Sequence, residues 1–292
     1  METGLDCIPC LFRQTLDAVR RVSADPVLCE RVVREVAGWV HAADLRESPP
    51  LMAARVHRFL RESTGIADPY AAAKMRDNEL ALGLLPELRE RLASASDPFA
   101  LAVRLAIAGN LIDLGPKSDL SVEDVLCGVR GCEEAPFSGD VASLKGAAAG
   151  ARKILYLADN AGEIVLDRLL IEELGPDRVT VAVRGAPTIN DATLKDARAA
   201  GLCDFVHVID NGSDVPGTLI DTCGSDFQAR FAQADLVIAK GQGNFETLSD
   251  VSRDICFLFK VKCSVIASKV GLPLGTQALV WSRGRKITAG ET

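Results

Sequence analysis

Hydrophobic residues recur every three to four positions through the first 130 residues, with charged residues between them. The segments CLFRQTLDAVRRV, PVLCERVVREVAGWV and ELALGLLPELRERL follow this spacing, which is typical of amphipathic helices. Another segment, FALAVRLAIAGNLIDLG, is apolar around most of its circumference, which predicts a buried helix. In DPYAAAKMRDNELAL, Asp68 and Pro69 predict an N-cap followed by proline at the first helical position. The amino-terminal part of the chain is therefore predicted to be all-helical.

A different pattern begins after residue 150, where short apolar runs alternate with helical segments. The predicted strands are KILYLA, RVTVAV, FVHVI and DLVIA, and the predicted helices between them are EIVLDRLLIEEL, DATLKDARAA and SDFQARFAQA. This alternation predicts βαβ units, and hence an α/β fold with a parallel sheet sandwiched between helices. Residues 131–150 are rich in small residues and could carry a linker. We therefore place a boundary near Lys145, between a helical domain at 1–145 and an α/β domain at 146–292.

Polar residues lie in the loop after each predicted strand. They are Asp159 and Asn160, Asn190 and Asp191, then Asp210, Asn211 and Gly212, and finally Lys240 with the loop GQGNFE. In an open parallel sheet the binding crevice lies beyond the carboxyl ends of the strands, so these side chains are expected to meet there. Carboxylate and amide oxygens suit Mg²⁺ or Mn²⁺, and a lysine supplies a positive charge for phosphate. The glycines around Gln242 would let backbone N–H groups approach an anion closely.

Each of these loops also has a purely structural interpretation. A single Asp-Asn pair after a strand is typical of a turn or a helix cap, and Asp210-Asn211-Gly212 is the most turn-like of the set. The repetition of the pattern at three strand ends favours a shared site. A dinucleotide fingerprint is not matched, because Glu246 stands where GxGxxG requires its third glycine.

Composition excludes some classes of function. With 33 basic and 40 acidic residues the net charge is −7, which argues against a general electrostatic grip on nucleic acid. No apolar run approaches the roughly 18–20 residues that span a bilayer, and the start lacks the pattern of a signal peptide, so we expect a cytoplasmic protein. The odd count of nine cysteines favours reduced thiols. Because the chain has only three histidines, a Ser-His-Asp triad or a multi-histidine zinc site is not favoured.

Several long motifs resemble those of the metal-dependent damage-control phosphatases, a family once known only as a domain of unknown function. They are LADNAGEIVLDRLLIEEL, VRGAPTINDATLKDA, DNGSDVPGT and AKGQGNFETL. CIPC followed by LFRQTLDA, DPYAAAK and AGNLID is similar to the stand-alone prokaryotic branch. The resemblance implies a helical region packed on a Rossmann-like α/β domain, with the active site in the cleft between them. It also implies hydrolysis of phosphorylated metabolites, such as sugar phosphates or damaged phosphometabolites, with Mg²⁺, Mn²⁺, Co²⁺ or Ni²⁺.

Carried over residue by residue, the resemblance places the catalytic metal ligands on Asp159, Asn160 and Asp191. It places substrate contacts on Glu163 and Lys240. We add further expected substrate contacts. They are Gly241, Gly243 and Asn244 in the glycine-rich loop, and Asn110 and Asp113 in the apolar helix of the amino-terminal region.

Two motifs in the helical region carry alternatives. Asn110 and Asp113 are three residues apart on an apolar helix, where polar groups must find partners. They either point into the cleft or cap the helix before Gly115. Cys7 and Cys10 in CIPC have metal-ligand or redox spacing, although ordinary reduced thiols at a helix start also fit. A zinc site would need two more ligands, for which Cys127 and Cys132 are candidates.

The leading hypothesis is hydrolysis of a phosphomonoester on an ion held by the three metal ligands. Lys240 and the N–H groups of the glycine loop would hold the other phosphoryl oxygens, and the helix that begins near Glu163 would add its positive end. Either water or an aspartate would be the nucleophile. The alternatives are a non-catalytic binder of a phosphorylated metabolite or nucleotide, and an S-adenosylmethionine-dependent carboxyl methyltransferase, an activity proposed for a eukaryotic branch. The expected partner is a small phosphorylated metabolite, without nucleic acid or membrane.

Overall fold

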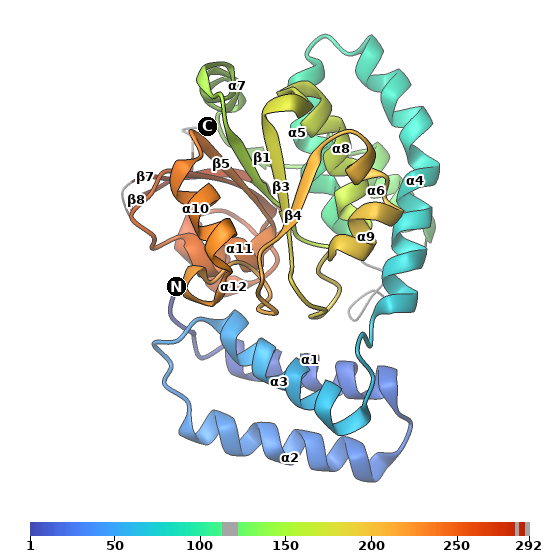
Figure 1. The fold of residues 1–292 in the computed structure, drawn as a ribbon, viewed down its shortest axis with the longest axis vertical. Helices are drawn as coiled ribbons and strands as arrows, with labels where there is room; N and C mark the ends of the chain where they lie inside the picture. The colour runs from blue at the N-terminus through green and yellow to red at the C-terminus, as the bar shows by residue number, and fades with distance from the viewer. Residues whose placement is uncertain (113–121, 284–285, 290–292) are drawn as a thin grey trace.

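A computed structural model describes residues 1–112, 122–283 and 286–289. The helices are α1 Cys7–Val22, α2 Pro26–Ala42, α3 Pro49–Thr64, α4 Ala71–Ser94, α5 Pro98–Ala108, α6 Val122–Arg130, α7 Val141–Gly150, α8 Glu163–Leu174, α9 Leu194–Ala199, α10 Ser225–Gln233, α11 Gly241–Leu248 and α12 Ser264–Val270. The strands are β1 Phe137–Ser138, β2 Ile154–Leu157, β3 Val179–Val183, β4 His207–Asp210, β5 Leu236–Lys240, β6 Ile255–Lys260, β7 Gln277–Arg283 and β8 Lys286–Ala289. The element order confirms the predicted run of helices followed by alternating strands and helices (Figure 1).

Within the described part of the chain, the strands form one sheet in the order β1-β7-β6-β5-β2-β3-β4, with β8 beside β7. Strands β2 to β6 pair in parallel, whereas β7 is antiparallel to both β6 and β8. The chain winds from β2 outward through β3 and β4, and then returns to place β5 on the other side of β2. The winding direction thus reverses between β2 and β5. Such a reversal opens a crevice at the carboxyl ends of the two strands.

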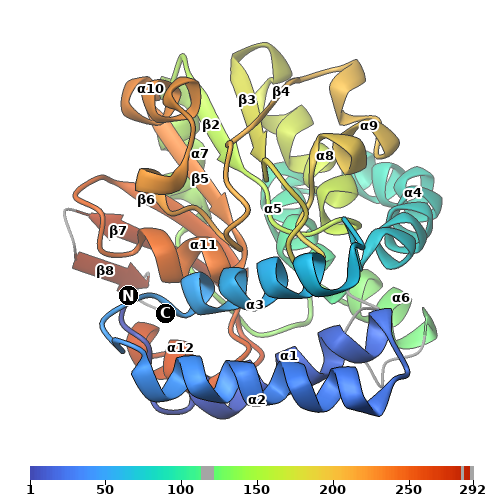
Figure 2. The ribbon, with the colours of Figure 1, turned by 60° about the horizontal axis from the view of Figure 1, so that its bottom comes forward.

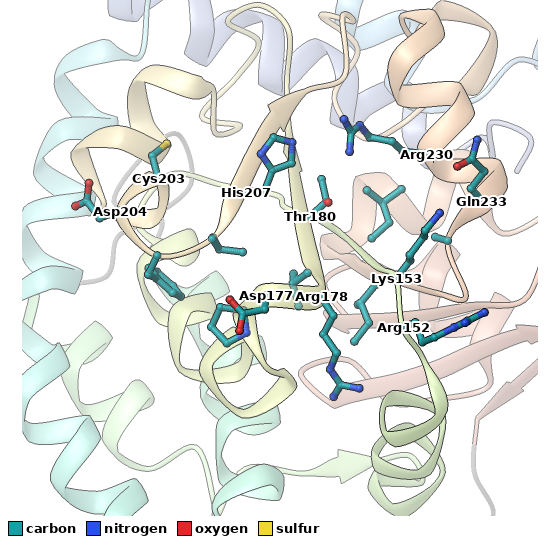
Figure 3. Close-up of a pocket in the computed structure, with 17 residues that line it drawn as sticks. Arg152, Lys153, Asp177, Arg178, Thr180, Cys203, Asp204, His207, Arg230 and Gln233 are labelled. Carbon is teal, nitrogen blue, oxygen red and sulfur yellow. The ribbon is translucent and has the colours of Figure 1, made fainter.

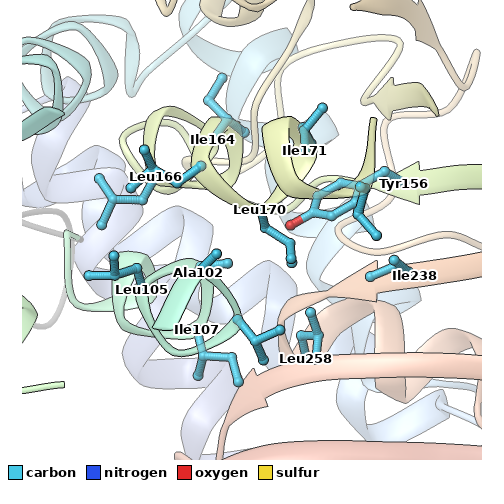
Figure 4. Close-up of a cluster of buried hydrophobic side chains, with 14 of the residues drawn as sticks. Ala102, Leu105, Ile107, Tyr156, Ile164, Leu166, Leu170, Ile171, Ile238 and Leu258 are labelled. Atoms are coloured by element: carbon cyan, nitrogen blue, oxygen red, sulfur yellow. The ribbon is translucent and has the colours of Figure 1, made fainter. Parts of the chain in front are cut away.

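The sheet is covered on both faces, which makes the three-layer arrangement. Alternate residues of β2 point to opposite faces, because side chains alternate along a strand. Ile154 and Tyr156 join the core made with α4, α5 and α8, and Figure 4 shows α5 and α8 packed over β5 and β6 in this cluster. Leu155 and Leu157 join the core formed with α10, α11 and α12. The mixed α/β fold with a parallel-dominated sheet is therefore confirmed.

Helices α1 to α3, here called the cap, form a hydrophobic core of their own, which also includes Tyr70. Figure 2 shows the cap stretched across one end of the α/β body. Polar contacts join the two parts. Arg58 and Arg61 of α3 both pair with Asp214, and an Nη of Arg61 donates to the carbonyl of Pro187 at 2.7 Å. The cap is thus a separately packed layer, fastened to the body largely through side-chain hydrogen bonds and ion pairs at its edges.

The predicted division at Lys145 does not coincide with the separation of these cores. Helices α4 and α5 share their core with α8 and the sheet, so the break between cores falls near residue 70. The stretch around Lys145 forms α7, whose N-cap Asp140 accepts from the backbone of Ser143. The division into domains at 1–145 and 146–292 stays a prediction about which parts fold as units.

One predicted helix start is wrong by two residues. Helix α4 begins at Ala71, and its N-cap position is Tyr70. Asp68 accepts a hydrogen bond from the backbone N–H of Tyr70 at 3.0 Å, and its carboxylate also pairs with Lys74. Asp68 therefore shapes the turn that leads into the helix instead of capping it at the predicted position. None of the helices in the described ranges is long and apolar enough to cross a membrane.

We expect the cap to lose stability in mild acid because of His57. This α3 side chain is buried, and burial together with the charge of Arg61 lowers the pKa of His57 to about 4. In the unfolded chain the imidazole titrates near 6.5, so protons favour the unfolded state as the pH falls from about 6.5 towards 4. The expected loss is about 3 kcal/mol in the free energy of unfolding.

Urea unfolding at several pH values measures this loss. The variant His57→Leu should lack that part of the pH dependence, whereas His41→Leu, at an exposed histidine, should keep it. Parallel pH profiles for the His57 variant and the parent protein would contradict the assignment.

Candidate metal centre and active site

Backbone pairing brings the predicted metal ligands together. Asp159 and Asn160 follow β2 directly, and Asp191 lies in the loop after β3. Asn160 and Asp191 form an isolated antiparallel bridge, and the N–H of Ala192 donates to the carbonyl of Asp159 at 2.8 Å. The two loops are therefore fastened side by side at the crevice between β2 and β5. The side chains of all three predicted ligands line one cavity of about 300 Å³.

Amide groups orient the carboxylates of this site. Asn160 Nδ2 donates to Asp159 Oδ2 at 2.9 Å and to Glu163 Oε2 at 3.1 Å. Asn110 Nδ2 donates to the same two oxygens, at 3.4 Å to Asp159 and 2.7 Å to Glu163. Because the nitrogen of Asn160 is engaged with these carboxylates, its amide oxygen is the atom that remains for a cation.

Arg184, which the sequence did not single out, is fully buried behind the carboxylates. Its Nε donates to Asp191 Oδ2 at 2.6 Å, and one terminal nitrogen lies 3.7 Å from Asp159 Oδ1. The N–H of Gly217 adds a hydrogen bond of 3.4 Å to Asp191 Oδ2. These contacts fix the directions of both carboxylates. Arg184 is thus a positioning residue for the candidate metal ligands.

Negative charge exceeds positive charge in this buried region. The buried acidic side chains are Asp159, Asp191, Glu163 and Asp167, and the buried basic side chains that contact them are Arg184 and Lys240. Burial, reinforced by Glu163 and Asp191, raises the pKa of Asp159 well above its usual range, and burial also raises the pKa of Asp191. Asp191 already has a positive partner in Arg184, whereas Asp159 needs a further positive partner to ionise readily. A divalent cation matches this charge deficit and the hard oxygen donors.

Within residues 1–112, 122–283 and 286–289, no group of three or more histidine, cysteine, aspartate or glutamate side chains is placed to hold a metal ion. A metal at this site would therefore depend on the amide oxygen of Asn160 as the third protein ligand, beside Asp159 and Asp191. The same finding counts against a zinc site built from CIPC with Cys127 and Cys132. Cys127 lines a separate hollow beside α6.

Lys240 lies beneath the cavity and does not line it. Its ammonium is fully buried and donates to Glu163 Oε1 at 2.8 Å, Asp167 Oδ1 at 2.6 Å and the carbonyl of Ala106 at 2.8 Å. These three acceptors use all three ammonium protons. Tyr156 also donates to Asp167 Oδ1, at 2.8 Å. Lys240 and Glu163 thus form a buried network under the site, and their predicted contacts with substrate stay predictions.

The glycine loop approaches the candidate metal ligands through its backbone. Gly241 begins α11 with φ +76°, and a Cβ at this position would lie 1.8 Å from Asp159 Oδ2. Any side chain at 241 would therefore displace the carboxylate. Gly243 lines the cavity. Asn244 is buried, and its Nδ2 donates to the carbonyls of Lys240 at 2.7 Å and Ala158 at 3.2 Å, which fastens α11 to the end of β2.

The remaining predicted residues separate into two groups. Asn110 lines the cavity from the turn after α5, whereas Asp113 lies outside the described residues. Asp210 accepts from the N–H of Gly212 at 3.0 Å, and Asn211 Oδ1 accepts from the N–H of Gly185 at 3.0 Å. Neither Asp210 nor Asn211 lines the cavity. That loop has the structural role that its turn-like sequence indicated.

The cap supplies the other wall of the cavity. The lining residues from α1 and its N-cap are Asp6, Cys7, Cys10, Leu11, Gln14 and Asp17, and those from α3 are Pro49, Pro50, Met52 and Ala53. The cavity therefore lies between the cap and the strand ends. Its wall mixes acidic, amide and apolar side chains.

Lys262 is a candidate functional residue that the sequence reasoning missed. It follows β6, lines the cavity, and is the one lysine or arginine among the lining residues that the structure describes. Its side chain is exposed, and its positive charge offsets part of the rise in the pKa of Asp159. Asp159 was identified because it is a polar residue that follows a predicted strand. Lys262 would have been identified in the same way if ICFLFK had been predicted as a strand.

A larger hollow of about 660 Å³ lies at the opposite end of the strands (Figure 3). It is lined by the first residues of β2, β3 and β4, and by side chains such as Lys153, Arg178, His207 and Arg230. It contains none of the predicted site residues. Size alone therefore does not locate the candidate site, which we place at the smaller cavity because the buried carboxylates converge there.

Comparison with known proteins gives an independent view of the chain. A family model for the damage-control phosphatase ARMT1-like domain matches residues 3–278. A damage-control phosphatase of Archaeoglobus fulgidus is 34% identical over 278 residues, which cover 92% of this chain and 95% of the relative. One of Pyrococcus horikoshii is 32% identical over 292 residues, covering 98% and 99%. The crystal structure of a DUF89 family protein from Pyrococcus horikoshii matches with a TM-score of 0.86 at 31% identity, covering 97% of this chain and 99% of that one.

Proposed function

The chain belongs to the damage-control phosphatase ARMT1-like domain family, and on that premise we propose that it is a divalent-metal-dependent phosphatase acting on small phosphomonoesters. The proposal rests on one observation. Asp159, Asn160 and Asp191 meet at the cavity wall, in a region where buried acidic side chains outnumber buried basic ones. Such a surplus is unfavourable in a protein without a bound cation, because each uncompensated buried charge costs several kcal/mol of folding free energy. A divalent cation with a phosphoryl group beside it would satisfy both the carboxylates and the cavity.

Each part of the site would have a distinct task. Asp159, Asn160 and Asp191 would hold the ion, which polarises a phosphoryl oxygen and offsets charge in an in-line displacement. Arg184 and Gly217 hold Asp191 in its direction, and the amides of Asn110 and Asn160 hold Asp159.

The substrate would lie between the strand ends and the cap. Lys262 would face the phosphoryl group, since it is the cation of the cavity wall. Gln14 and Asp17 of α1, on the cap side, and Gln242 of α11, on the strand-end side, line the cavity and would hydrogen-bond hydroxyl groups of the remaining part of the substrate. We therefore infer that the substrate is a phosphorylated polyol or sugar of small size. The attacking group is water or an aspartate, and rapid quenching of a turnover reaction distinguishes them by the presence of a phosphoenzyme.

Metal removal tests the proposal. Phosphate release from p-nitrophenyl phosphate and a panel of sugar phosphates should vanish after EDTA treatment. It should return when Mn²⁺, Co²⁺, Ni²⁺ or Mg²⁺ is restored, because no side chain at the site replaces the charge of the ion. Full activity in EDTA would contradict metal dependence. Tight ligand binding without any phosphate release would instead indicate a binding protein.

Removing the Lys262 charge should weaken substrate capture. A charged hydrogen bond to phosphate contributes about 1.5–3 kcal/mol, so Lys262→Met should lower kcat/KM on the order of 10- to 100-fold. Steady-state kinetics measures the loss. The matched control is Lys269→Met in α12, which lies outside the cavity and pairs with Asp250. Equal kinetics for the two variants would remove Lys262 from the site.

A further inference from the structure

Three thiols line the same cavity as the candidate metal ligands. Cys7 and Cys10 come from the first turns of α1, and Cys263 is the N-cap residue of α12. The other six of the nine cysteines do not line it. Cys7 and Cys10 belong to the cap, whereas Cys263 belongs to the α/β body. Thiols therefore line the cavity from both of the parts that enclose it.

The chain neighbours of Cys7 and Cys263 are in direct contact. Ser264 Oγ donates to Asp6 Oδ2 at 3.0 Å. Gly4 lies so close to Val265 that an added Cβ would approach its side chain to 3.3 Å and the Sγ of Cys7 to 3.9 Å. These contacts hold the start of α1 against the start of α12. A disulfide between Cys7 and Cys263 requires their Cα atoms to lie within about 7 Å of each other, and the contacts above bring the chain neighbours of the two cysteines together.

The surroundings of the thiols distinguish their roles. Burial raises the pKa of Cys7, and the neighbouring charges of Glu246, Cys263 and Cys10 raise it further, in that order of size. Gln242 Nε2 donates to the Sγ of Cys263 at 3.5 Å, and both residues line the cavity, so this contact holds the Cys263 sulfur at the cavity wall.

We propose that Cys7 and Cys263 are a peroxide-sensitive pair whose disulfide fastens the cap over the cavity. In the first step the sulfur of Cys263 attacks one oxygen of a hydroperoxide, the O–O bond breaks, and the proton of the Cys263 thiol passes to the leaving oxygen, so that a sulfenic acid and water or an alcohol form. In the second step the thiol of Cys7 attacks that sulfur, the S–S bond forms, the S–O bond breaks, and hydroxide leaves as water with the proton of Cys7. Two electrons pass from the two thiols to the peroxide.

The separate core of the cap explains why this bond would matter. A layer with its own core can shift as a body when its polar contacts to the rest of the protein open. A covalent link between α1 and α12 removes that freedom at the cavity. A bond between Cys7 and Cys10 would lie within one helix and would leave the cap free to move.

Peroxide treatment of the full chain, followed by a non-reducing peptide map, tests the proposal. We expect a Cys7–Cys263 crosslink with a mass loss of two hydrogen atoms. Phosphate release should fall at least about tenfold, because opening of an enclosing layer limits turnover, and dithiothreitol should restore it. Cys7→Ser, Cys7→Ala and Cys263→Ser should each abolish the crosslink and the inactivation. Cys10→Ser and Cys203→Ser, the latter at an exposed thiol outside the cavity, should retain both.

The peptide map decides the pairing even if the protein releases no phosphate, so a failure of the proposed function is distinguishable from a failure of this inference. A map that shows only a Cys7–Cys10 bond, or only sulfinic acids, would overturn the pairing. A Cys7–Cys263 bond that leaves phosphate release unchanged would overturn the fastening of the cap.

Discussion

Replacing Asp159 with alanine should lower metal-dependent phosphate release at least on the order of 10³-fold, because it removes a ligand from an ion expected to contribute several kcal/mol to catalysis. The fold should persist. In the metal-free protein the Asp159 carboxylate is buried beside Glu163 and Asp191, and these neighbours together with burial raise its pKa. Its removal therefore relieves repulsion, and the free energy of unfolding in EDTA should stay the same or rise.

Three measurements check this expectation: phosphate release, metal binding by calorimetry, and urea unfolding in EDTA. The control is Asp210→Ala, which removes a carboxylate from a strand-end turn outside the cavity. That variant should keep metal binding and activity. Near-normal turnover of the Asp159 variant would show that the ion, if any, lies elsewhere.

Replacing Lys240 with methionine should destabilise the protein by about 3–5 kcal/mol, since it leaves buried charges without their partner. The ammonium is the shared donor to Glu163 and Asp167, and no solvent reaches it. Interaction with these two carboxylates raises the pKa of Lys240 despite burial, so the lysine is charged at neutral pH. Methionine has a similar length but cannot donate.

Urea unfolding separates this role from the substrate contact predicted from sequence. Lys262→Met is the matched control, because it removes an exposed lysine from the cavity wall and should leave the unfolding free energy nearly unchanged. If Lys240→Met instead keeps full stability and raises KM, then Lys240 reaches the substrate and the buried network rearranges in turnover.

The strand-end ligands could be predicted because the information is local. A buried apolar run followed by Asp159 and Asn160 indicates both the strand and the polar loop, whereas Asp191 lies at the end of the longer loop after the next predicted strand, and its assignment as a ligand came from the resemblance. The parallel arrangement then follows from the alternation of strands and helices. All four strands predicted from the alternation are present.

The direction of the Lys240 side chain could not be predicted in this way. It depends on Glu163 and Asp167 of α8 and on the carbonyl of Ala106, which the fold brings together from distant positions. Strands β7 and β8 fall outside the βαβ pattern, because β7 runs antiparallel to β6. Strand β6 continues the parallel pattern after α11, but ICFLFK was not among the predicted strands, so the loop that carries Lys262 had no structural context. The cap residues that line the cavity could not be predicted either, because their positions depend on long-range packing.

The backbone of Gly241 has a consequence for how this catalyst could change over time or in the laboratory. Because any side chain there would collide with Asp159, position 241, beside the proposed metal site, tolerates almost no substitution. The cap wall is different, since Gln14, Asp17 and Met52 face the cavity without supporting the carboxylates. Substitutions intended to change which phosphate esters are accepted should therefore be made in α1 and α3, and the strand-end turns should be left unchanged.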